Sequence, residues 1–237
     1  MDFSIDILIP TYNRKKFEKL ITHNISIQSY PLIKNIIVAD DSDIDLPLYL
    51  PTKYNLNYYK VERMSIGAKR NFLLSKSTSR YAVFMDTDDF YNPDYISHSI
   101  HTLLMSGKSI TGTSDMLMYY QEQTYRLSCI FFHAINEATL VIDTHNVKLK
   151  FKEQNSSEGL EPLKNHIGDI VQTDINKVMC CICHKENTID KKVWLEERYK
   201  TDFEMVEYDE HLKILSDINI YELQQFQFAA TSATSTA

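Results

Sequence analysis

Blocks of apolar and polar residues alternate along the first half of the chain. Short strand-like runs are separated or followed by longer segments with helical spacing; in residues 15–27, for example, Phe17, Leu20 and Ile25 share one helical face. The predicted strands are residues 5–10, 36–39, 56–61 and 80–85, and the predicted helices are residues 15–27, 65–77 and 93–106. This order predicts an α/β architecture in which a parallel sheet is built with right-handed crossovers.

The second half of the chain has a less regular pattern. Its predicted β segments are residues 109–120, 124–132, 139–143 and 178–183, and its predicted helices are residues 190–199 and 206–216. Residues 153–176 are polar with scattered apolar positions, which favours a long loop or flap. The last ten residues carry no charged side chain, and we expect residues 223–237 to be a disordered tail or a linker to a further domain.

Carboxylates follow the fourth predicted strand directly. Asp86, Asp88 and Asp89 end the apolar run in YAVFMDTDD, and Asp86 and Asp88 are two positions apart, so they point the same way in a continuing strand. Ligands of parallel sheets bind at the carboxyl ends of the strands, and two hard oxygen donors there suit Mg²⁺ or Mn²⁺. A turn or helix cap is the competing interpretation, which fits Asp89 best because a turn into a helix follows it.

Composition narrows the classes of partner. The chain has 237 residues and a net charge of −7, which argues against nucleic acid as the main partner. It has no apolar run of the ~20 residues that a membrane-spanning helix needs, and its first residues do not resemble a signal peptide. We therefore expect a cytoplasmic protein, with peripheral association with a membrane left open. A longer parent chain is also expected.

Cysteines cluster near the end of the chain's last predicted strand. Cys180, Cys181 and Cys183, with Cys129 further upstream, are expected to be free thiols that pack as small apolar residues. A zinc site needs four ligands, and the CCICH segment has no partner pair elsewhere. His184 ends this strand beside the expected cleft, where contact with an acceptor or a phosphate and a plain surface position both remain open.

Four segments together resemble a known family. ILIPTYNR, IIVADDSD, GAKRN and YAVFMDTDD are similar, in order and spacing, to the inverting glycosyltransferases of family 2. The resemblance implies the GT-A fold, a mostly parallel sheet flanked by helices with a smaller mixed β region on the acceptor side. It also implies one catalytic domain over residues 1–222, whose nucleotide-sugar half is residues 1–106 and whose acceptor half is residues 107–222.

The resemblance also implies roles for individual residues. Asp88 would bind Mn²⁺ or Mg²⁺, with Asp86 on the ribose or beside the metal; Asp40 would accept a hydrogen bond from the pyrimidine, and Tyr12 would stack. Lys69 and Arg70 would face the phosphates, since basic groups at that edge oppose their charge. The implied donor-binding residues are Pro10, Thr11, Tyr12, Arg14, Asp40, Gly67, Lys69, Arg70, Asp86 and Thr87.

The segment VEYDEHLKIL resembles the acidic helix that carries the family's catalytic base. By that resemblance Glu207 would be the base, with Asp209 as the second candidate. The implied reaction is transfer of a sugar, with inversion, from a UDP-sugar to a carbohydrate or other hydroxyl acceptor.

Two other functions remain as alternatives. A sugar-1-phosphate nucleotidyltransferase shares a similar sheet, but it needs a glycine-rich phosphate loop that PTYNRKK lacks. A sugar-nucleotide-binding domain without catalysis is the other alternative.

Overall fold

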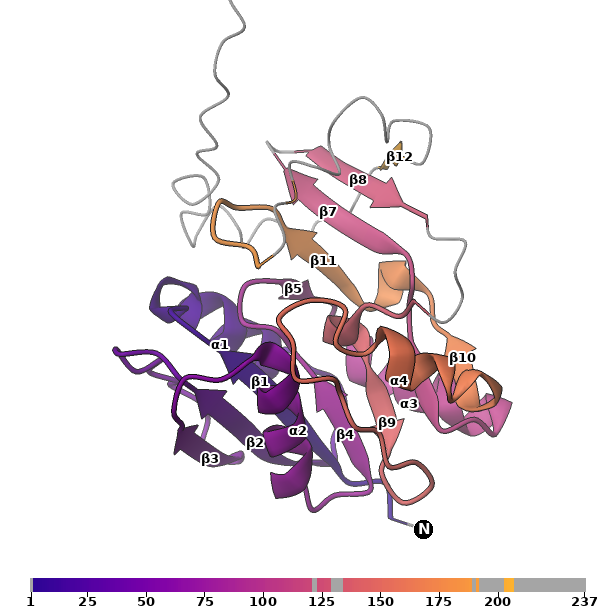
Figure 1. The fold of residues 1–237 in the computed structure, drawn as a ribbon, viewed down its shortest axis with the longest axis horizontal. Coiled ribbons are helices and arrows are strands. Elements are labelled where there is room, and N and C mark those ends of the chain that lie inside the picture. Colours follow the sequence, from indigo (N-terminus) through magenta and orange to yellow (C-terminus); the bar gives the residue numbers. More distant parts are fainter. Residues whose placement is uncertain (1, 121–122, 129–133, 189–190, 192–202, 207–237) are drawn as a thin grey trace, which may run out of the picture.

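The structure, a computed structural model, describes residues 2–120, 123–128, 134–188, 191 and 203–206 (Figure 1). In this part of the chain two sheets form. The larger has the strand order β10 (Ile170–Gln172), β6 (Ile110–Gly112), β9 (Val141–Asp143), β4 (Tyr81–Phe84), β1 (Ile5–Thr11), β2 (Ile33–Asp40) and β3 (Asn55–Lys60). Strands β4, β1, β2 and β3 are parallel, and β9 runs antiparallel to β4 and β6. The predicted α/β architecture with a mostly parallel sheet is confirmed.

The smaller sheet has the order β12 (Phe203–Val206), β8 (Gln123–Leu127), β7 (Met116–Tyr120), β11 (Met179–Ile182) and β5 (Phe90–Tyr91). The sheet is mixed: β11 and β7 are parallel, whereas the other neighbouring strands of this sheet are antiparallel. Figure 1 shows β7, β8 and β11 above the larger sheet. The predicted smaller mixed β region is therefore present.

Helices cover both faces of the larger sheet because its strands are apolar on both sides. Ile7, Ile9 and Val38 face α1 (Glu18–Ser26) and α3 (Tyr95–Ser106), whereas Leu8 and Ile37 face α2 (Ile66–Lys76) and the segment that leads to α4 (Leu160–Lys164). Short 3₁₀ turns occur at Lys15–Phe17, Glu137–Thr139, Ile167–Asp169 and Ile175–Lys177. Both faces of the central strands β1 and β2 are therefore buried over most of their length.

Some expectations for the second half were wrong. Residues 109–120 are two strands rather than one β segment, because a turn in which Thr113 Oγ1 accepts from Asp115 N separates β6 from β7. Residues 153–176 are not a loop throughout, since buried Leu163 and Ile170 anchor α4 and β10. Val206, the predicted start of a helix, ends β12.

Other expectations lie outside the described residues. They are the helix at residues 190–199, except Lys191, the helix at residues 207–216 and the tail at residues 223–237. Within the described part, no helix has the length and apolar character needed to cross a membrane.

The strand ends meet because of the parallel register. Thr11 of β1 is paired with Asp40 of β2, and Leu8 is paired with Phe84 at the end of β4. Asn13, in the turn after β1, has a positive φ of 53°, a conformation that Asn tolerates, and its N–H donates to Ser42 Oγ. The turns after β1, β2 and β4 therefore share one edge.

The segment before α4 reaches this edge through a close approach to Gly67. Gly67 N donates to Gln154 O at 3.1 Å, and a Cβ at this position would overlap the Lys152 carbonyl oxygen. The resemblance had placed Gly67 among the donor-binding residues. The observed close approach is to the protein's own backbone, and it brings residues 152–158 over the edge of the sheet.

Gly67→Ala should therefore destabilise the fold by about 2 kcal/mol or more, because the added methyl group has no space without displacing backbone. Denaturant unfolding measures the change. Gly168→Ala is the matched control, since a Cβ there meets nothing within 4 Å, and its effect should stay within about 0.5 kcal/mol. Equal stabilities of the two variants would contradict the close approach.

Candidate active site

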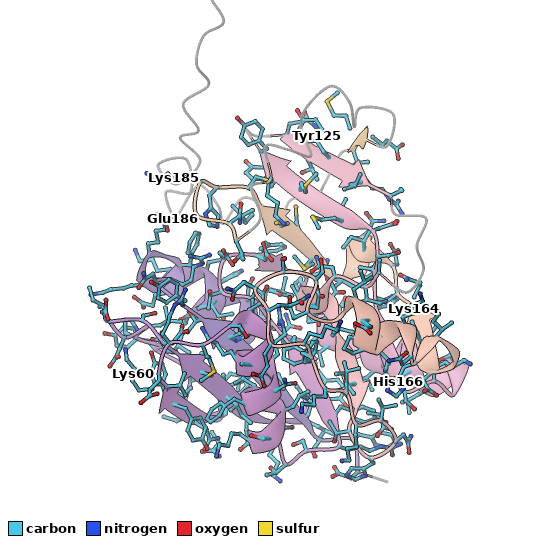
Figure 2. All side chains as sticks on the ribbon, viewed as in Figure 1. Lys60, Tyr125, Lys164, His166, Lys185 and Glu186 are labelled. Carbon is cyan, nitrogen blue, oxygen red and sulfur yellow. The ribbon has the colours of Figure 1, made fainter. Side chains whose placement is uncertain are left out.

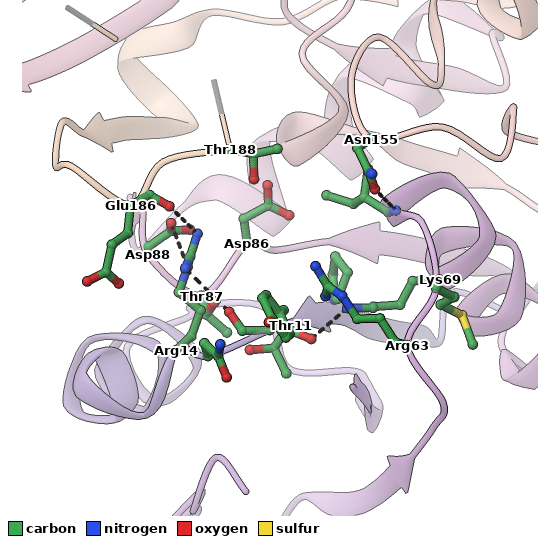
Figure 3. A pocket seen from close by; sticks show the side chains of 15 residues that line it. Thr11, Arg14, Arg63, Lys69, Asp86, Thr87, Asp88, Asn155, Glu186 and Thr188 are labelled. Atoms are coloured by element: carbon green, nitrogen blue, oxygen red, sulfur yellow. Dashed lines mark hydrogen bonds and ion pairs between the residues drawn. The ribbon is translucent and has the colours of Figure 1, made fainter. Parts of the chain in front are cut away.

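A cavity of about 460 Å³ opens at the shared strand edge (Figure 3). Its walls come from the turn after β1, the start of α2, the turn after β4 and the loop after β11. Eight predicted site residues line it: Pro10, Thr11, Tyr12, Arg14, Lys69, Asp86, Thr87 and Asp88. Parallel sheets bind ligands at this location, so the cavity is the candidate active site.

One wall of the cavity is aromatic and basic. The Arg63 guanidinium lies 3.3 Å from the centre of the Tyr12 ring and pairs with Asp41 at 3.1 Å. Lys69, which is buried, donates to Thr11 O at 2.7 Å and to Asp41. Burial lowers the pKa of Lys69, although Asp41 beside it acts in the opposite direction. Buried in this way, Lys69 is not part of a solvated helix face.

The opposite wall is built around Asp88. Its Oδ2 accepts from Arg14 Nε at 2.9 Å and lies 3.0 Å from His184 Nε2. Burial alone would raise the pKa of Asp88, but the charge of Arg14 and the hydrogen bond to His184 hold it well below its ordinary value. Asp88 is therefore a carboxylate at neutral pH, with one oxygen shared between two nitrogen donors.

The loop after β11 completes this wall. Glu186 O accepts from Arg14 Nη2 at 2.8 Å, and the Glu186 carboxylate pairs with Lys16 at 2.5 Å. Figure 2 labels Glu186 and Lys185 on this loop, and Figure 3 shows Glu186 beside Arg14. This loop also carries His184, so it ties β11 to the turn after β1.

Arg70 is the buried centre of the site. Its Nε donates to Glu158 Oε1 at 2.9 Å, and its Nη2 donates to the two oxygens of Asp86 at 3.2 and 3.3 Å. Burial raises the pKa of Asp86, and the Arg70 guanidinium acts against that rise. Arg70 thus holds the first carboxylate of the D-x-D segment in place.

Two buried polar atoms of the site have no hydrogen-bond partner among the described residues. They are Thr11 Oγ1, on the main cavity, and Arg70 Nη1, on an adjoining pocket. A buried polar group without a partner is costly, so such atoms need an explanation. A polar ligand in the two spaces would supply the missing partners.

The remaining predicted residues lie elsewhere. Asp40 is buried, and its carboxylate accepts from Ser42, from the Tyr58 hydroxyl and from Leu46 N. Neither Asp40 nor Gly67 lines the cavity, and the predicted contact between Asp40 and a pyrimidine stays a prediction. Glu207 and Asp209, the predicted bases, lie outside the described residues.

Asp89 does not cap the following helix as expected. Its carboxylate accepts from Ile182 N at 3.2 Å, whereas the residue at the start of α3 is Asp94. Cys180, Cys181 and Cys183 are buried in the core, as predicted for small apolar residues.

Sequence reasoning missed several residues of the site. Arg63, Asn155, Glu158 and Glu137 were not singled out, and His184 was left without a role. A basic residue after the third strand could have suggested Arg63. The others come from irregular segments, in which no periodic pattern indicates proximity to the cavity.

Replacing the buried cation tests this arrangement. Arg70→Gln should destabilise the protein by about 3–5 kcal/mol, because Asp86 and Glu158 would lose their shared partner. Denaturant unfolding measures the loss. Lys60→Gln removes a cation from an exposed pair with Asp45 and should leave the unfolding midpoint unchanged. Similar midpoints for Arg70→Gln and Lys60→Gln would contradict the role of Arg70.

Comparison with known proteins identifies relatives of the chain. The sequence model of the family "Glycosyl transferase family 2" matches residues 6–128. The poly(ribitol-phosphate) beta-N-acetylglucosaminyltransferase TarS of Staphylococcus aureus is 28% identical over 127 residues, which cover 47% of this chain and 22% of TarS. The putative teichuronic acid biosynthesis glycosyltransferase TuaG of Bacillus subtilis is 26% identical over 120 residues, 48% of this chain and 47% of TuaG. The match thus spans less than half the length of either relative.

Solved structures show a likeness of fold. The crystal structure of S. aureus TarS 1–349 in complex with UDP-GlcNAc has a TM-score of 0.60 at 14% identity, covering 78% of this chain and 60% of that chain. A second neighbour is glucosyl-3-phosphoglycerate synthase from Mycobacterium tuberculosis, in complex with Mn²⁺, UDP and glucosyl-3-phosphoglycerate. It has a TM-score of 0.50 at 15% identity, and the match covers 71% of this chain and 68% of that chain. Because the family model matches more than half of the 237 residues and the sheet has the GT-A arrangement, the chain belongs to glycosyl transferase family 2.

Proposed function

We propose that this protein is a metal-dependent glycosyltransferase that transfers a sugar from a UDP-sugar to a hydroxyl acceptor with inversion. The observation that carries the proposal is the cavity at the strand edge, where Asp86 and Asp88 face a wall formed by Tyr12, Arg63 and Lys69. A nucleoside diphosphate sugar combines an aromatic base, two phosphates and a polar ring, and these walls offer a partner for each.

The aromatic and basic wall suits the nucleotide. Tyr12 and the Arg63 guanidinium present flat surfaces for a base, since both groups stack on aromatic rings. Lys69 and Arg14 supply positive charge for the diphosphate, and the unpartnered Thr11 hydroxyl supplies a hydrogen bond. Asp40 supports this wall through its bonds to Ser42 and Leu46 N, and its predicted role toward a pyrimidine is part of the proposal.

The residues around Asp88 fit a divalent cation. Asp86 and Asp88 both line the cavity and bring two carboxylates to one wall, while buried His184, outside the lining, lies 3.0 Å behind Asp88 Oδ2. Among the described residues, no cluster of three or more His, Cys, Asp or Glu forms a closed metal cage. Mn²⁺ and Mg²⁺ commonly bind through one or two protein ligands together with substrate phosphates and water.

We therefore assign Asp88 and Asp86 as the residues that would hold Mn²⁺ or Mg²⁺, with His184 supporting Asp88 from behind. The cation would neutralise the charge that builds up on the leaving diphosphate. Arg14 donates to the same Asp88 oxygen and places a second positive charge at that position. Asp86, held by Arg70, is oriented toward the donor sugar or ribose.

The relatives support the donor class. Among the fold neighbours, TarS forms a complex with UDP-GlcNAc, and the M. tuberculosis synthase forms one with Mn²⁺ and UDP. The family match covers residues 6–128, which include every predicted donor-binding residue. We infer a UDP-sugar donor on this basis and leave the acceptor as a carbohydrate or other hydroxyl compound.

Thermal unfolding with ligands tests the proposal. UDP or UDP-N-acetylglucosamine should raise the midpoint of the unaltered protein more with Mn²⁺ than with EDTA, because a ligand that binds the native state stabilises it. Asp88→Asn should remove the part that depends on Mn²⁺. Asp45→Asn, an exposed carboxylate outside the cavity, is the control and should keep the full response.

Several outcomes would contradict the proposal. Equal stabilisation with Mn²⁺ and with EDTA would exclude a role for the metal in donor binding. No stabilisation by any UDP compound would exclude the donor class. Donor binding without any release of UDP, with or without acceptors, would favour a binding domain that lacks catalysis.

A further inference from the structure

A second pocket adjoins the donor cavity and contains a carboxylate that the proposed function does not use. The pocket has a volume of about 110 Å³ and shares Asp86, Asp88 and Thr188 with the main cavity. Its far side includes Glu137, in the 3₁₀ turn Glu137–Thr139 that precedes β9. Glu137 therefore lies beside the carboxylates that face the donor, on the side away from Tyr12 and Arg63.

Glu137 is held by the backbone of a glycine. Its Oε1 accepts from Gly159 N at 2.9 Å, at the start of α4. A Cβ built on Gly159 would lie 3.0 Å from both Cγ and Oε1 of Glu137, which is too close for an unperturbed contact. The missing side chain at position 159 thus leaves the space that the Glu137 carboxylate fills.

Three of the other four carboxylates of this pocket have charged partners. Asp86 and Glu158 share Arg70, while Asp88 contacts Arg14 and His184. The fourth, Asp89, accepts from the backbone N–H of Ile182 in β11. Within the described residues, Glu137 likewise accepts from a neutral backbone N–H and forms no ion pair.

The charges around Glu137 favour proton uptake. Burial and the neighbouring Glu158 raise its pKa to about 7, and Arg70 acts against that rise. Asp86 and Lys191 line the same pocket from the turn after β4 and from beyond β11. A carboxyl group with this pKa is half ionised at neutral pH, where a general base is most effective.

We propose that Glu137 is the general base that takes the proton from the acceptor hydroxyl; this inference rests on the proposed glycosyltransferase function. As the acceptor oxygen bonds to the anomeric carbon, the bond from that carbon to the diphosphate oxygen breaks, and its electron pair leaves with UDP. The acceptor proton passes to Glu137 Oε2, the oxygen not used by Gly159, so charge and atoms balance. With water in place of the acceptor, the same step hydrolyses the donor.

This assignment competes with the base predicted from the sequence. Glu207 and Asp209 were selected by resemblance in a segment outside the described residues. Glu137 is selected by its position in a pocket continuous with the donor cavity. The two assignments predict different inactive variants, so one experiment can separate them.

The experiment compares Glu137→Gln and Glu207→Gln with the unaltered protein. The first assay measures release of UDP from UDP-N-acetylglucosamine and from UDP-glucose, with Mn²⁺, between about pH 5 and 9. Water and glycerol serve as acceptors. The second assay measures UDP affinity by calorimetry. Glu137→Gln keeps an acceptor for Gly159 N–H, so it removes the basic group and preserves the local hydrogen bond. Glu153→Gln, at an exposed site outside both pockets, is the matched control.

Glu137→Gln should lower UDP release by at least ~10²-fold while leaving UDP affinity unchanged. In the unaltered protein, UDP release should fall as the pH drops through about 7, the pKa of Glu137, because the base becomes protonated. Glu137→Gln should lack this fall in UDP release at low pH. Glu153→Gln should retain both the activity and this pH dependence, and the effect of Glu207→Gln decides between the two assignments.

Thermal unfolding gives a second readout that does not depend on turnover. Because the native state raises the pKa of Glu137, ionisation above that pKa costs stability. Glu137→Gln should therefore unfold at a higher temperature than the unaltered protein near pH 8, and the difference should shrink toward pH 5. A purely structural Glu137 would instead give a less stable variant at both pH values.

Three results would overturn the assignment of Glu137. They are near-normal UDP release by Glu137→Gln, loss of UDP affinity in that variant, and an inactive Glu207→Gln beside an active Glu137→Gln. An unaltered protein that binds no UDP compound would instead contradict the proposed function itself, so the two failures are distinguishable.

Discussion

The buried guanidinium of Arg70 is the interaction on which the rest of the site depends. It is 2% exposed, and it joins three segments that are far apart in the chain: α2, the turn after β4 and the loop before α4. Its charge lies 5.1 Å from the Phe84 ring and faces two carboxylates, so its burial is compensated by charge and by packing. Without this cation, Asp86 and Glu158 would be two adjacent buried carboxylates, and the strand edge could not present Asp86 to a ligand in a defined orientation.

The parallel sheet and the edge shared by its strand ends could be predicted because their signals are local. Apolar runs such as residues 5–10 and 80–85 each end in polar residues, and parallel pairing necessarily brings those ends together. Eight of the predicted donor and metal residues accordingly line one cavity. Asp40 illustrates the limit of this reasoning: its strand position was right, but the Tyr58 hydroxyl and the turn at Ser42 engage its carboxylate, and neither contact has a periodic signature.

The second half of the chain could not be predicted equally well, because its positions depend on long-range packing. His184 reaches Asp88 only because β11 pairs with both β5 and β7, and Glu158 reaches Arg70 only because Gly67 admits the Lys152 backbone. These are contacts between single residues over large sequence separations. A short strand or a polar loop gives no indication of which of its side chains will meet a partner.

The distribution of charge explains why the two pockets can have different chemistry. In the donor cavity, Arg14, Arg63 and Lys69 offset Asp41 and Asp88, so the region favours an anionic ligand and keeps Asp88 ionised. In the adjoining pocket, the cations Arg70 and Lys191 are outnumbered by five carboxylates, Asp86, Asp88, Asp89, Glu137 and Glu158. Burial and the neighbouring Glu158 raise the pKa of Glu137, and Arg70, which pairs with Asp86 and Glu158, opposes that rise only in part. This balance of charge is what the proposed role of Glu137 as a base requires.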